Sequence, residues 1–343
     1  MEDPCPGLEY LLPLKWSEDS GLDELADYLG LLSGHTRVLV VDGSDEDLFA
    51  AHARAFPAGV RHCRPGHPEC RNGKVDGVLT GIALAEGEYL IIADDDVRYT
   101  PQQLDQVGVL LGDADVVRPQ NYFASPAALP SPLPSALRSP LRPPLRPALP
   151  WHARWDTGRI LLNRAFGADY PGTLAVRTAV LQRTGGYSGD ALFENLELLR
   201  TVRAAGGTEV RADDLFIARL PASTAQFFRQ RVRQAYDDLA QPLRLAAELS
   251  LLPVLCWSAR KPLRLAAFAV SVTAAAEYGR RRDGGRRVFA ASSALWAPLW
   301  VLERAVCVWL AAAWRLRGGV PYSGTRLKTA AHSVRWIRRS LRG

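Results

Sequence analysis

Three consecutive aspartates, Asp94, Asp95 and Asp96, follow the apolar run 89–93. Adjacent carboxylates repel one another, so such a cluster is favourable where a cation neutralises it. Mg²⁺ and Mn²⁺ prefer oxygen ligands and often share their coordination shell with the phosphates of a substrate. The triplet therefore predicts a divalent metal site that receives a phosphate-containing ligand. The structural alternative is an exposed acidic turn or a cluster at a helix N-terminus.

The segments around the aspartates alternate between two hydrophobic patterns. Segments 8–16 and 36–44 are apolar runs typical of strands, as is the run before the triplet, whereas 21–32 and 74–87 carry apolar residues at helical spacing. Apolar strands that alternate with helices predict an α/β fold with a buried, largely parallel sheet. Ligands of such sheets bind beyond the carboxyl ends of the strands, where both the triplet and Asp42 are expected.

Charge is divided unevenly along the 343 residues, whose net charge is +6 and whose apolar content of 48% excludes a disordered chain. Residues 257–343 hold 17 Lys and Arg against 3 Asp and Glu, whereas residues 1–256 hold 25 against 33. This division predicts an acidic to neutral catalytic or binding body with a basic appendage. We expect no nucleic-acid partner. The first ten residues do not resemble a secretory signal, and five scattered cysteines indicate reduced thiols in a cytosolic compartment.

Four segments occur in a fixed order along the chain: VVDGS at 40–44, NGKVDGVLTGIALAEGEYLIIADDD at 72–96, FENLELL at 193–199 and FFRQRVRQAY at 227–236. In order and spacing they resemble the family 2 glycosyltransferases, over about residues 8–240. The resemblance implies the GT-A nucleotide-sugar-binding fold. This fold has a Rossmann-like mixed, mainly parallel sheet flanked by helices.

The resemblance also implies roles. Asp94 and Asp96 match the two acids of the family's Asp-x-Asp motif, which implies Mn²⁺ or Mg²⁺, and Asp95 fills the variable middle place. A metal there would neutralise charge on the leaving diphosphate. The Gln-Arg-x-Arg element of the membrane-associated branch is present, with Gln234 in place of its Trp, and its arginines would clamp the diphosphate. The predicted nucleotide-sugar-binding residues are Asp42, Lys74, Asp94, Asp95, Gln230, Arg231 and Arg233.

Two of these features also have structural alternatives. Lys74 is equally typical of an ordinary helix start, and the arginines of 227–236 are also typical of a basic amphipathic helix on a membrane surface.

A glycosyl acceptor loses its hydroxyl proton as it attacks, so a carboxylate base is required. The family has a Glu-Asp pair, with Asp as the base in many members, where this chain has Glu194 and Asn195. Glu194 is the predicted base, because it begins an expected helix whose dipole keeps it ionised, and Glu197 is the alternative. The family is inverting, which implies one direct displacement at the anomeric carbon. Asn195 also leaves open a chain that has lost its activity.

Residues 150–177 lie between the metal motif and this helix, in a stretch that contributes to the acceptor side in the family. His152, Trp155, Asp156 and Arg159 are its polar and aromatic candidates for acceptor contacts. The structural alternative is that these side chains are aromatic anchors and a helix cap.

Two regions depart from the α/β pattern. Residues 125–150 are rich in proline and predict a surface insertion. From residue 243 onward, apolar helical runs alternate with arginine clusters. We therefore expect a glycosyltransferase domain at 1–242 and a membrane-associated helical region at 243–343.

How the helical region would meet a membrane stays open. A spanning helix needs about 20 apolar residues. The longest run, 288–316, contains Pro298, Glu303 and Arg304. Helices that span the bilayer, helices that lie in its interface, and a helical subdomain packed on the sheet all fit this pattern.

The sequence thus predicts an inverting, metal-dependent transfer of a sugar from a nucleotide diphosphate sugar. The resemblance implies a uridine nucleotide. The expected acceptor is a lipid, a lipid-linked molecule or a glycan at the cytosolic face of the plasma (inner) membrane. Two alternatives remain: a catalytically degenerate nucleotide-sugar-binding or scaffold protein of a glycan-assembly complex, and a sugar nucleotidyltransferase, since that class also uses strand-end acids with Mg²⁺.

Overall fold

A computed structural model of the chain describes residues 7–18, 21–67, 69–125, 129, 149–167, 169–322 and 324–342. Cys5 and almost all of the predicted insertion at 125–150 lie outside these residues. The cysteines that the structure describes are free thiols: Cys63, Cys70, Cys256 and Cys307.

The centre of the molecule is an eight-stranded sheet made of β1 (Leu8–Leu14), β2 (Arg37–Asp42), β3 (Val60–Cys63), β4 (Tyr89–Ala93), β5 (Val97–Arg98), β6 (Val116–Phe123), β7 (Thr173–Arg177) and β8 (Glu209–Arg219). Their spatial order is β3-β2-β1-β4-β7-β6-β8-β5. β1 to β4 are parallel, β7 is antiparallel to β4 and β6, and β8 is parallel to β6. β8 therefore runs in the same direction as β4, so both strands end at one edge of the sheet.

Helices cover both faces of the sheet: α1 (Leu22–Ser33), α2 (Glu46–Ala55), α3 (Gly73–Leu84), α4 (Pro101–Gly112), α5 (Trp151–Phe166), α6 (Thr178–Thr184), α7 (Glu194–Ala204) and α8 (Thr224–Tyr236). Side chains of α1 and α4 share one core with Tyr10 and Leu12, whereas those of α3, α6 and α7 share a second core with Leu11. β1 is thus buried on both faces, which explains its continuous apolar sequence. The predicted α/β fold with a mixed, mainly parallel sheet is confirmed.

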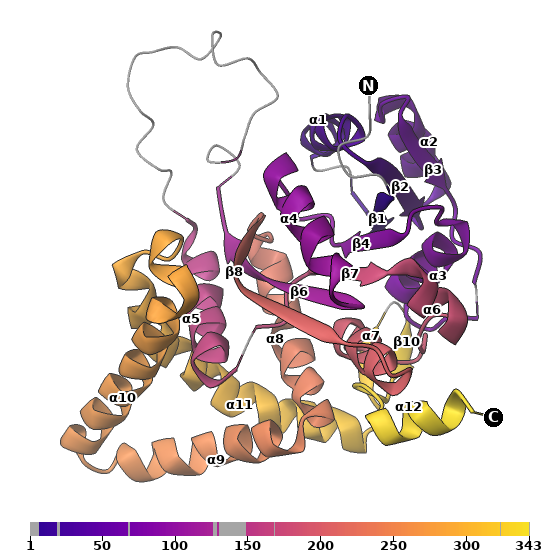
Figure 1. Ribbon diagram of the computed structural model, residues 1–343. Helices are drawn as coiled ribbons and strands as arrows, with labels where there is room; N and C mark the ends of the chain where they lie inside the picture. Colours follow the sequence, from indigo (N-terminus) through magenta and orange to yellow (C-terminus); the bar gives the residue numbers. More distant parts are fainter. Residues whose placement is uncertain are drawn as a thin grey trace, which may run out of the picture.

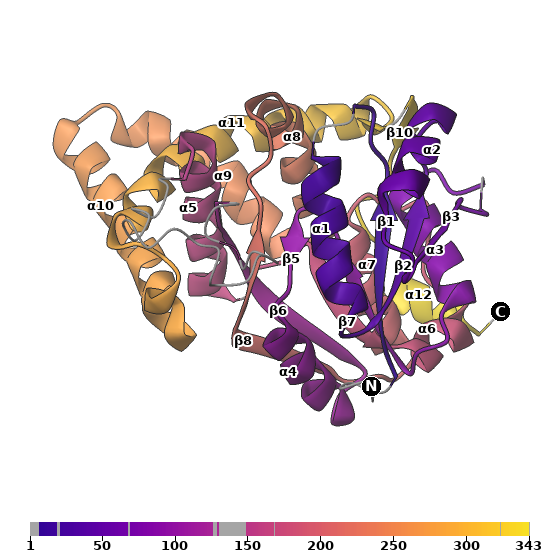
Figure 2. The same ribbon diagram turned by 90° about the horizontal axis from the view of Figure 1, so that it is seen from above.

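The second half of the chain continues as η3 (Asp237–Ala240), α9 (Pro242–Ser258), α10 (Pro262–Arg281), η4 (Arg282–Arg287), η5 (Ala291–Trp296) and α11 (Ala297–Leu316). α5 and α10 lie at the end of the molecule farthest from α2 and β3, and α9 and α11 run from there along the lower side of Figure 1 towards its middle (Figure 1, Figure 2). α5, α10 and α11 share a core that includes Ile160, Ala276 and Trp300.

Two glycines bring these helices together. A Cβ at Gly158 would lie 2.8 Å from the Ala297 nitrogen, and one at Gly279 would collide with the Leu161 carbonyl. Both positions therefore need glycine because another backbone approaches closely.

One helical stretch of the described residues, Ala291–Leu316, is long and apolar enough to cross a membrane. Its mean hydropathy is 1.4, and half of its apolar window is buried inside the protein. Core helices of soluble proteins have the same properties, so this stretch does not decide between the alternatives left open by the sequence.

The chain then returns to the sheet through a hairpin, β9 (Val320–Tyr322) and β10 (Thr325–Leu327), and ends in α12 (Val334–Ser340). α12 lies beside α7 in both views (Figure 1, Figure 2). Just before α7, the Leu192 and Phe193 amides donate to the carbonyls of Thr329 and Ala330, at 3.0 and 2.8 Å. The C-terminal segment thereby becomes part of the support of α7.

Candidate active site

The carboxyl ends of β4 and β8 and the first turns of α3 and α7 meet at one edge of the sheet. Asn72 caps α3, since its side chain accepts from the Lys74 amide at 3.1 Å. This cap fixes Lys74, whose Nζ lies 2.5 Å from Asp94 Oδ1 and 2.5 Å from Glu194 Oε1. The structure thus brings together three residues that the sequence predicted separately.

Arg219, which the sequence analysis missed, completes this cluster. Its Nη2 lies 2.6 Å from Asp96 Oδ2 and 3.4 Å from Asp94 Oδ2, and its Nε lies 3.1 Å from both Asp96 oxygens. It ends β8, next to the aspartates in space but 123 residues after Asp96 in sequence. A single arginine in a strand has no spacing that marks it, so no sequence signal pointed to it.

The two motif acids have opposite electrostatic environments. Burial would raise the pKa of Asp94, but Lys74 and Arg219 outweigh burial and lower it. Burial raises the pKa of Asp96 to about 6; the negative charges of Asp94 and Asp95 add to the rise, and Arg219 opposes it. Two cations therefore keep Asp94 ionised, whereas Asp96, which has Arg219 alone against the charges of two neighbouring acids, is the motif acid that protonates first as the pH falls.

Asp94 and Asp96 have the right chemistry for a hard divalent cation. Their side chains remain 24% and 25% exposed, and their oxygens are the ligands that Mg²⁺ and Mn²⁺ prefer. Among the described residues no group of three or more His, Cys, Asp or Glu could hold a metal. Two carboxylates fit an ion that takes its remaining ligands from water and substrate phosphates. All four oxygens, however, already contact Lys74 or Arg219.

The middle acid and Asp42 have other partners. Asp95 accepts a hydrogen bond from Trp16 Nε1 at 2.5 Å. Asp42 is fully buried and contacts His52 Nδ1 at 2.6 Å, His62 Nε2 at 3.1 Å and the Ser44 amide at 2.9 Å. Burial would raise the pKa of Asp42, but these hydrogen bonds outweigh burial and lower it. A direct contact between Asp42 and a nucleoside, as the resemblance implied, would require these partners to move.

The residues considered for the base differ in accessibility. Glu194 faces Lys74 at the edge of the cluster, whereas Asn195 Nδ2 donates to the Pro171 carbonyl at 2.8 Å. Glu197 is buried and accepts from the His332 amide at 2.7 Å, and its other oxygen lies 2.9 Å from His332 Nδ1. Glu197 therefore holds the C-terminal segment, and Glu194 is the carboxylate of α7 that lies in the cluster.

The two arginines of the Gln-Arg-x-Arg element lie in different places on α8. Arg231 is buried and binds Asp156 at 2.7 and 3.0 Å and Glu303 at 3.3 Å, so it does not face the aspartates. The Arg233 guanidinium lies over the Tyr322 ring, 5.1 Å from the ring centroid. Burial would raise the pKa of Asp94, whereas Lys74, Arg219 and, to a smaller extent, Arg233 lower it. Gln230 is half-buried. Of the two predicted diphosphate clamps, only Arg233 lies near the cluster.

The predicted acceptor residues tie helices together. Trp155 Nε1 donates to Glu303 at 3.0 Å, Arg159 lies 3.5 Å from Asp169, and His152 packs against Phe227 at 5.7 Å. Together with the Asp156–Arg231 pair, the contacts of Trp155 and His152 join α5 to α8 and α11, whereas Arg159 joins α5 to the loop before β7. Trp155 and His152 thus lie as the aromatic anchors of the structural alternative, and none of the four residues caps α5, whose N-cap residue is Pro150.

The C-terminal hairpin also reaches the cluster. Tyr322 donates its hydroxyl hydrogen to Asn72 Oδ1 at 3.0 Å, so it contacts the residue that caps the Lys74 helix. The two residues are 250 positions apart, which explains why the sequence did not indicate the contact.

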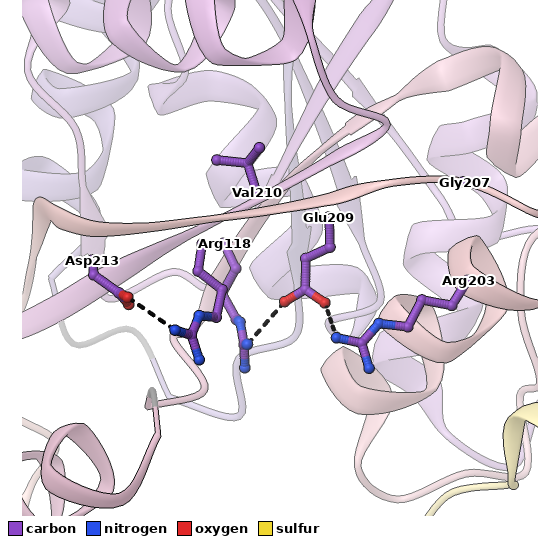
Figure 3. Close-up of a pocket in the computed structure, with 7 residues that line it drawn as sticks. Arg118, Arg203, Gly207, Glu209, Val210 and Asp213 are labelled. Atoms are coloured by element: carbon purple, nitrogen blue, oxygen red, sulfur yellow. Dashed lines mark hydrogen bonds and ion pairs between the residues drawn. The ribbon is translucent and has the colours of Figure 1, made fainter.

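A second charged region lies at the opposite end of β8, around a cavity of about 680 Å³ lined by Arg118, Arg203, Glu209, Arg211 and Asp213. Its charges pair with one another (Figure 3). Arg118 and Arg203 both bind Glu209, and Arg211 lies 3.3 Å from Asp213. Glu209 begins β8 whereas Arg219 ends it, so this cavity is separate from the aspartate cluster.

Comparison with known proteins gives a family match for part of the chain. Residues 23–160, which include the aspartate triplet, match the model "Glycosyl transferase family 2". No curated protein sequence matches the chain significantly.

Several solved structures are similar. The mannosyltransferase PcManGT from Pyrobaculum calidifontis, in complex with GDP-Man and Mn²⁺, is 14% identical with a TM-score of 0.45, covering 89% of this chain and 87% of its own. The glucosyl-3-phosphoglycerate synthase from Mycobacterium tuberculosis, in complex with Mn²⁺, UDP and phosphoglyceric acid, is 15% identical with a TM-score of 0.39, covering 65% and 74%.

Proposed function

The chain carries a glycosyl transferase family 2 region at residues 23–160, and from this premise we propose that it is an inverting, metal-dependent glycosyltransferase. Its donor is a nucleotide diphosphate sugar, with a uridine nucleotide expected. Its acceptor is a lipid, a lipid-linked molecule or a glycan at the cytosolic face of the membrane. The observation that carries the proposal is the cluster of Lys74, Asp94, Asp96, Glu194 and Arg219 at the carboxyl edge of the sheet.

The cluster provides two kinds of group that glycosyl transfer needs. Asp94 and Asp96 would hold Mn²⁺ or Mg²⁺, which when bound neutralises charge on the leaving diphosphate. Arg233 and Lys74 add positive charge beside these acids. Glu194 supplies the carboxylate that takes the proton of the acceptor hydroxyl. Lys74, at 2.5 Å from Glu194, orients this carboxylate and holds it next to the motif acids.

A donor screen tests the activity. The full chain is incubated with Mn²⁺, a panel of labelled nucleotide sugars and a membrane lipid extract. We expect release of nucleoside diphosphate with one donor, and loss of this release in Asp96→Ala and in Glu194→Gln. Asp113→Asn, a change of an exposed acid at the end of α4, is the matched control and should keep full activity.

The products also separate the alternatives. A sugar nucleotidyltransferase would instead join a sugar 1-phosphate to a nucleoside triphosphate and release pyrophosphate, so a parallel reaction with these two substrates identifies that class. Metal-dependent nucleotide binding without turnover of any donor would favour a degenerate binding or scaffold protein. Asn195 and the engagement of Glu194 by Lys74 are the observations on which that second candidate function rests.

The membrane part of the proposal rests on the outer surface of α11. Its charged pair points inward: Arg304 is 1% exposed and lies 2.8 Å from Asp238, and Glu303 binds Trp155 and Arg231. The exposed apolar residues of α11 include Leu299, Leu302, Val306, Trp309 and Leu310. A helix with one face in the protein and an apolar face outside is the type that lies in a membrane interface.

Vesicle flotation tests the membrane surface. The wild-type chain should float with anionic phospholipid vesicles, and the double change Leu302→Glu, Leu310→Glu should reduce the floating fraction by at least about half, because it places charge on the apolar face. Val109→Glu, at an exposed apolar position of α4, is the matched control. A wild-type chain that stays soluble without detergent and does not float would contradict this part of the proposal, independently of the donor screen.

A further inference from the structure

The backbone of Arg219 is fixed where the two motif acids meet. Arg219 is paired with Val97 where β8 runs beside β5, and the backbone amide of Leu220 donates to the Asp96 carbonyl at 2.7 Å. Gly172 lies against its guanidinium: a Cβ at Gly172 would be 2.8 Å from Arg219 Cζ and 2.6 Å from Asp94 Oδ2. Any other residue at 172 would therefore crowd the contact between this arginine and the acids.

The guanidinium occupies the oxygens that a metal would need. Its Nε contacts both Asp96 oxygens at 3.1 Å, and its Nη2 reaches Asp96 Oδ2 at 2.6 Å. Lys74 holds Asp94 Oδ1, and Arg219 contacts Asp94 Oδ2. A divalent cation bound between Asp94 and Asp96 would have to take oxygens from Arg219.

We propose that Arg219 is a resident counter-ion that competes with the divalent metal for Asp96 and moves onto the diphosphate of the nucleotide sugar when the metal binds. The planar guanidinium matches phosphate oxygens as well as carboxylates, so the displaced side chain has a partner only when a diphosphate is present. This inference rests on the proposed function, because it assumes a metal and a nucleoside diphosphate in one site.

Charge balance gives the physical consequence. A metal that binds alone leaves Arg219 without a carboxylate partner in a partly buried site, which is unfavourable. A metal and a diphosphate that bind together add charges of opposite sign and supply the displaced arginine with a new partner. Metal and nucleotide therefore bind cooperatively, and each must tighten the other by the same factor.

Mn²⁺ binding to the full chain, measured from the electron paramagnetic resonance signal of free Mn²⁺, tests the proposal. Titrations are made with and without saturating UDP or GDP, with correction for the Mn²⁺–nucleotide complex in solution. For the wild type we expect at least tenfold tighter Mn²⁺ binding when the matching nucleotide is present. Arg219→Gln should bind Mn²⁺ alone about tenfold more tightly than the wild type and show less than a threefold effect of nucleotide.

Two further variants complete the experiment. Arg219→Lys keeps a positive charge but loses the planar guanidinium that contacts both acids, so its Mn²⁺ affinity should lie between those of wild type and Arg219→Gln. Arg177→Gln is the matched control, since Arg177 ends β7 and pairs with Glu88 and Asp115 away from the cluster. It should bind Mn²⁺ as the wild type does.

The possible results separate this inference from the proposed function. Mn²⁺ binding that Arg219→Gln weakens or leaves unchanged overturns the inference alone, as does a wild-type Mn²⁺ affinity that nucleotide does not alter. The second result needs no variant, so it decides even if Arg219→Gln fails to fold. Absence of Mn²⁺ binding in every variant, with and without nucleotide, overturns the metal requirement of the proposed function and this inference with it.

Discussion

The molecule contains two clusters of paired charges that differ in accessibility. In the catalytic-edge cluster, Lys74, Arg219 and the acids they bind are 16% to 25% exposed. In the helix-junction cluster, Arg231 and Arg304 bind acids of α5, α11, η3 and α9, and the paired side chains are only 1% to 12% exposed. The same ion-pair chemistry thus lies at the proposed ligand site where solvent enters, and it holds helices together where solvent does not enter.

The largest expected effect is at the catalytic edge. Asp96→Asn removes a proposed metal ligand, so we expect turnover to fall at least about 100-fold, as for loss of a group that stabilises a transition state. Because Asp96 is partly exposed, the midpoint of thermal unfolding should shift by only a few degrees. Steady-state kinetics and differential scanning calorimetry measure the two effects. A large loss of stability with normal turnover would instead assign Asp96 a structural role of the kind expected at the helix junction.

The helix junction should respond in the opposite way. Asp156→Ala leaves Arg231 buried without its main partner, which typically costs about 3 kcal/mol of folding free energy. We expect this loss in urea unfolding, with turnover per folded molecule within about threefold of wild type. The double change Asp156→Leu, Arg231→Met should recover part of the stability, because it removes both charges. A fall in turnover without a change in stability would assign Asp156 to the acceptor site.

The pKa of Asp237 is affected by charges of both clusters. Burial raises its pKa to about 8, with Glu194 and Asp238 adding to the rise and Arg233 and Arg304 opposing it. The folded chain thus retains a proton that the unfolded chain releases near pH 4, so folding stability falls as the pH rises from about 4 to 8.

Asp237→Asn removes this dependence. The variant should melt several degrees above wild type at pH 9, and the difference should shrink steadily towards pH 4, as measured by thermal scans across the pH range. A difference that stays constant with pH would mean that Asp237 is ionised in the folded protein.

The smallest effect is expected at the hairpin that touches the catalytic edge. Tyr322→Phe removes one hydrogen bond to Asn72, a loss of about 1 kcal/mol. Turnover should fall only a few-fold, because Asn72, which caps the helix of Lys74, is then held less firmly. Kinetics on the purified variant measure this effect, and a loss as large as that of Asp96→Asn would place Tyr322 in the chemistry itself.

The sequence predicted those parts of the site that local pattern determines. Asp94 and Asp96 follow an apolar strand, and Lys74 begins a helix, so their meeting at the sheet edge follows from the α/β pattern. Arg219 was not predictable, because its role comes from the sheet order that brings the end of β8 to the end of β4. The sequence motif predicted that Arg231 binds the diphosphate, but its position on α8 directs its side chain towards Asp156.

The return of the C-terminal segment to α7 has a consequence for synthesis of the chain. Glu197 on α7 meets His332, and the strand-like contacts before α7 use Thr329 and Ala330. While residues 329–332 are still inside the ribosome, Glu197 lacks the His332 partner that it has in the folded protein, and the helix that carries Glu194 lacks this support. The contacts that hold α7 in the folded protein can therefore form only after residue 332 has left the ribosome.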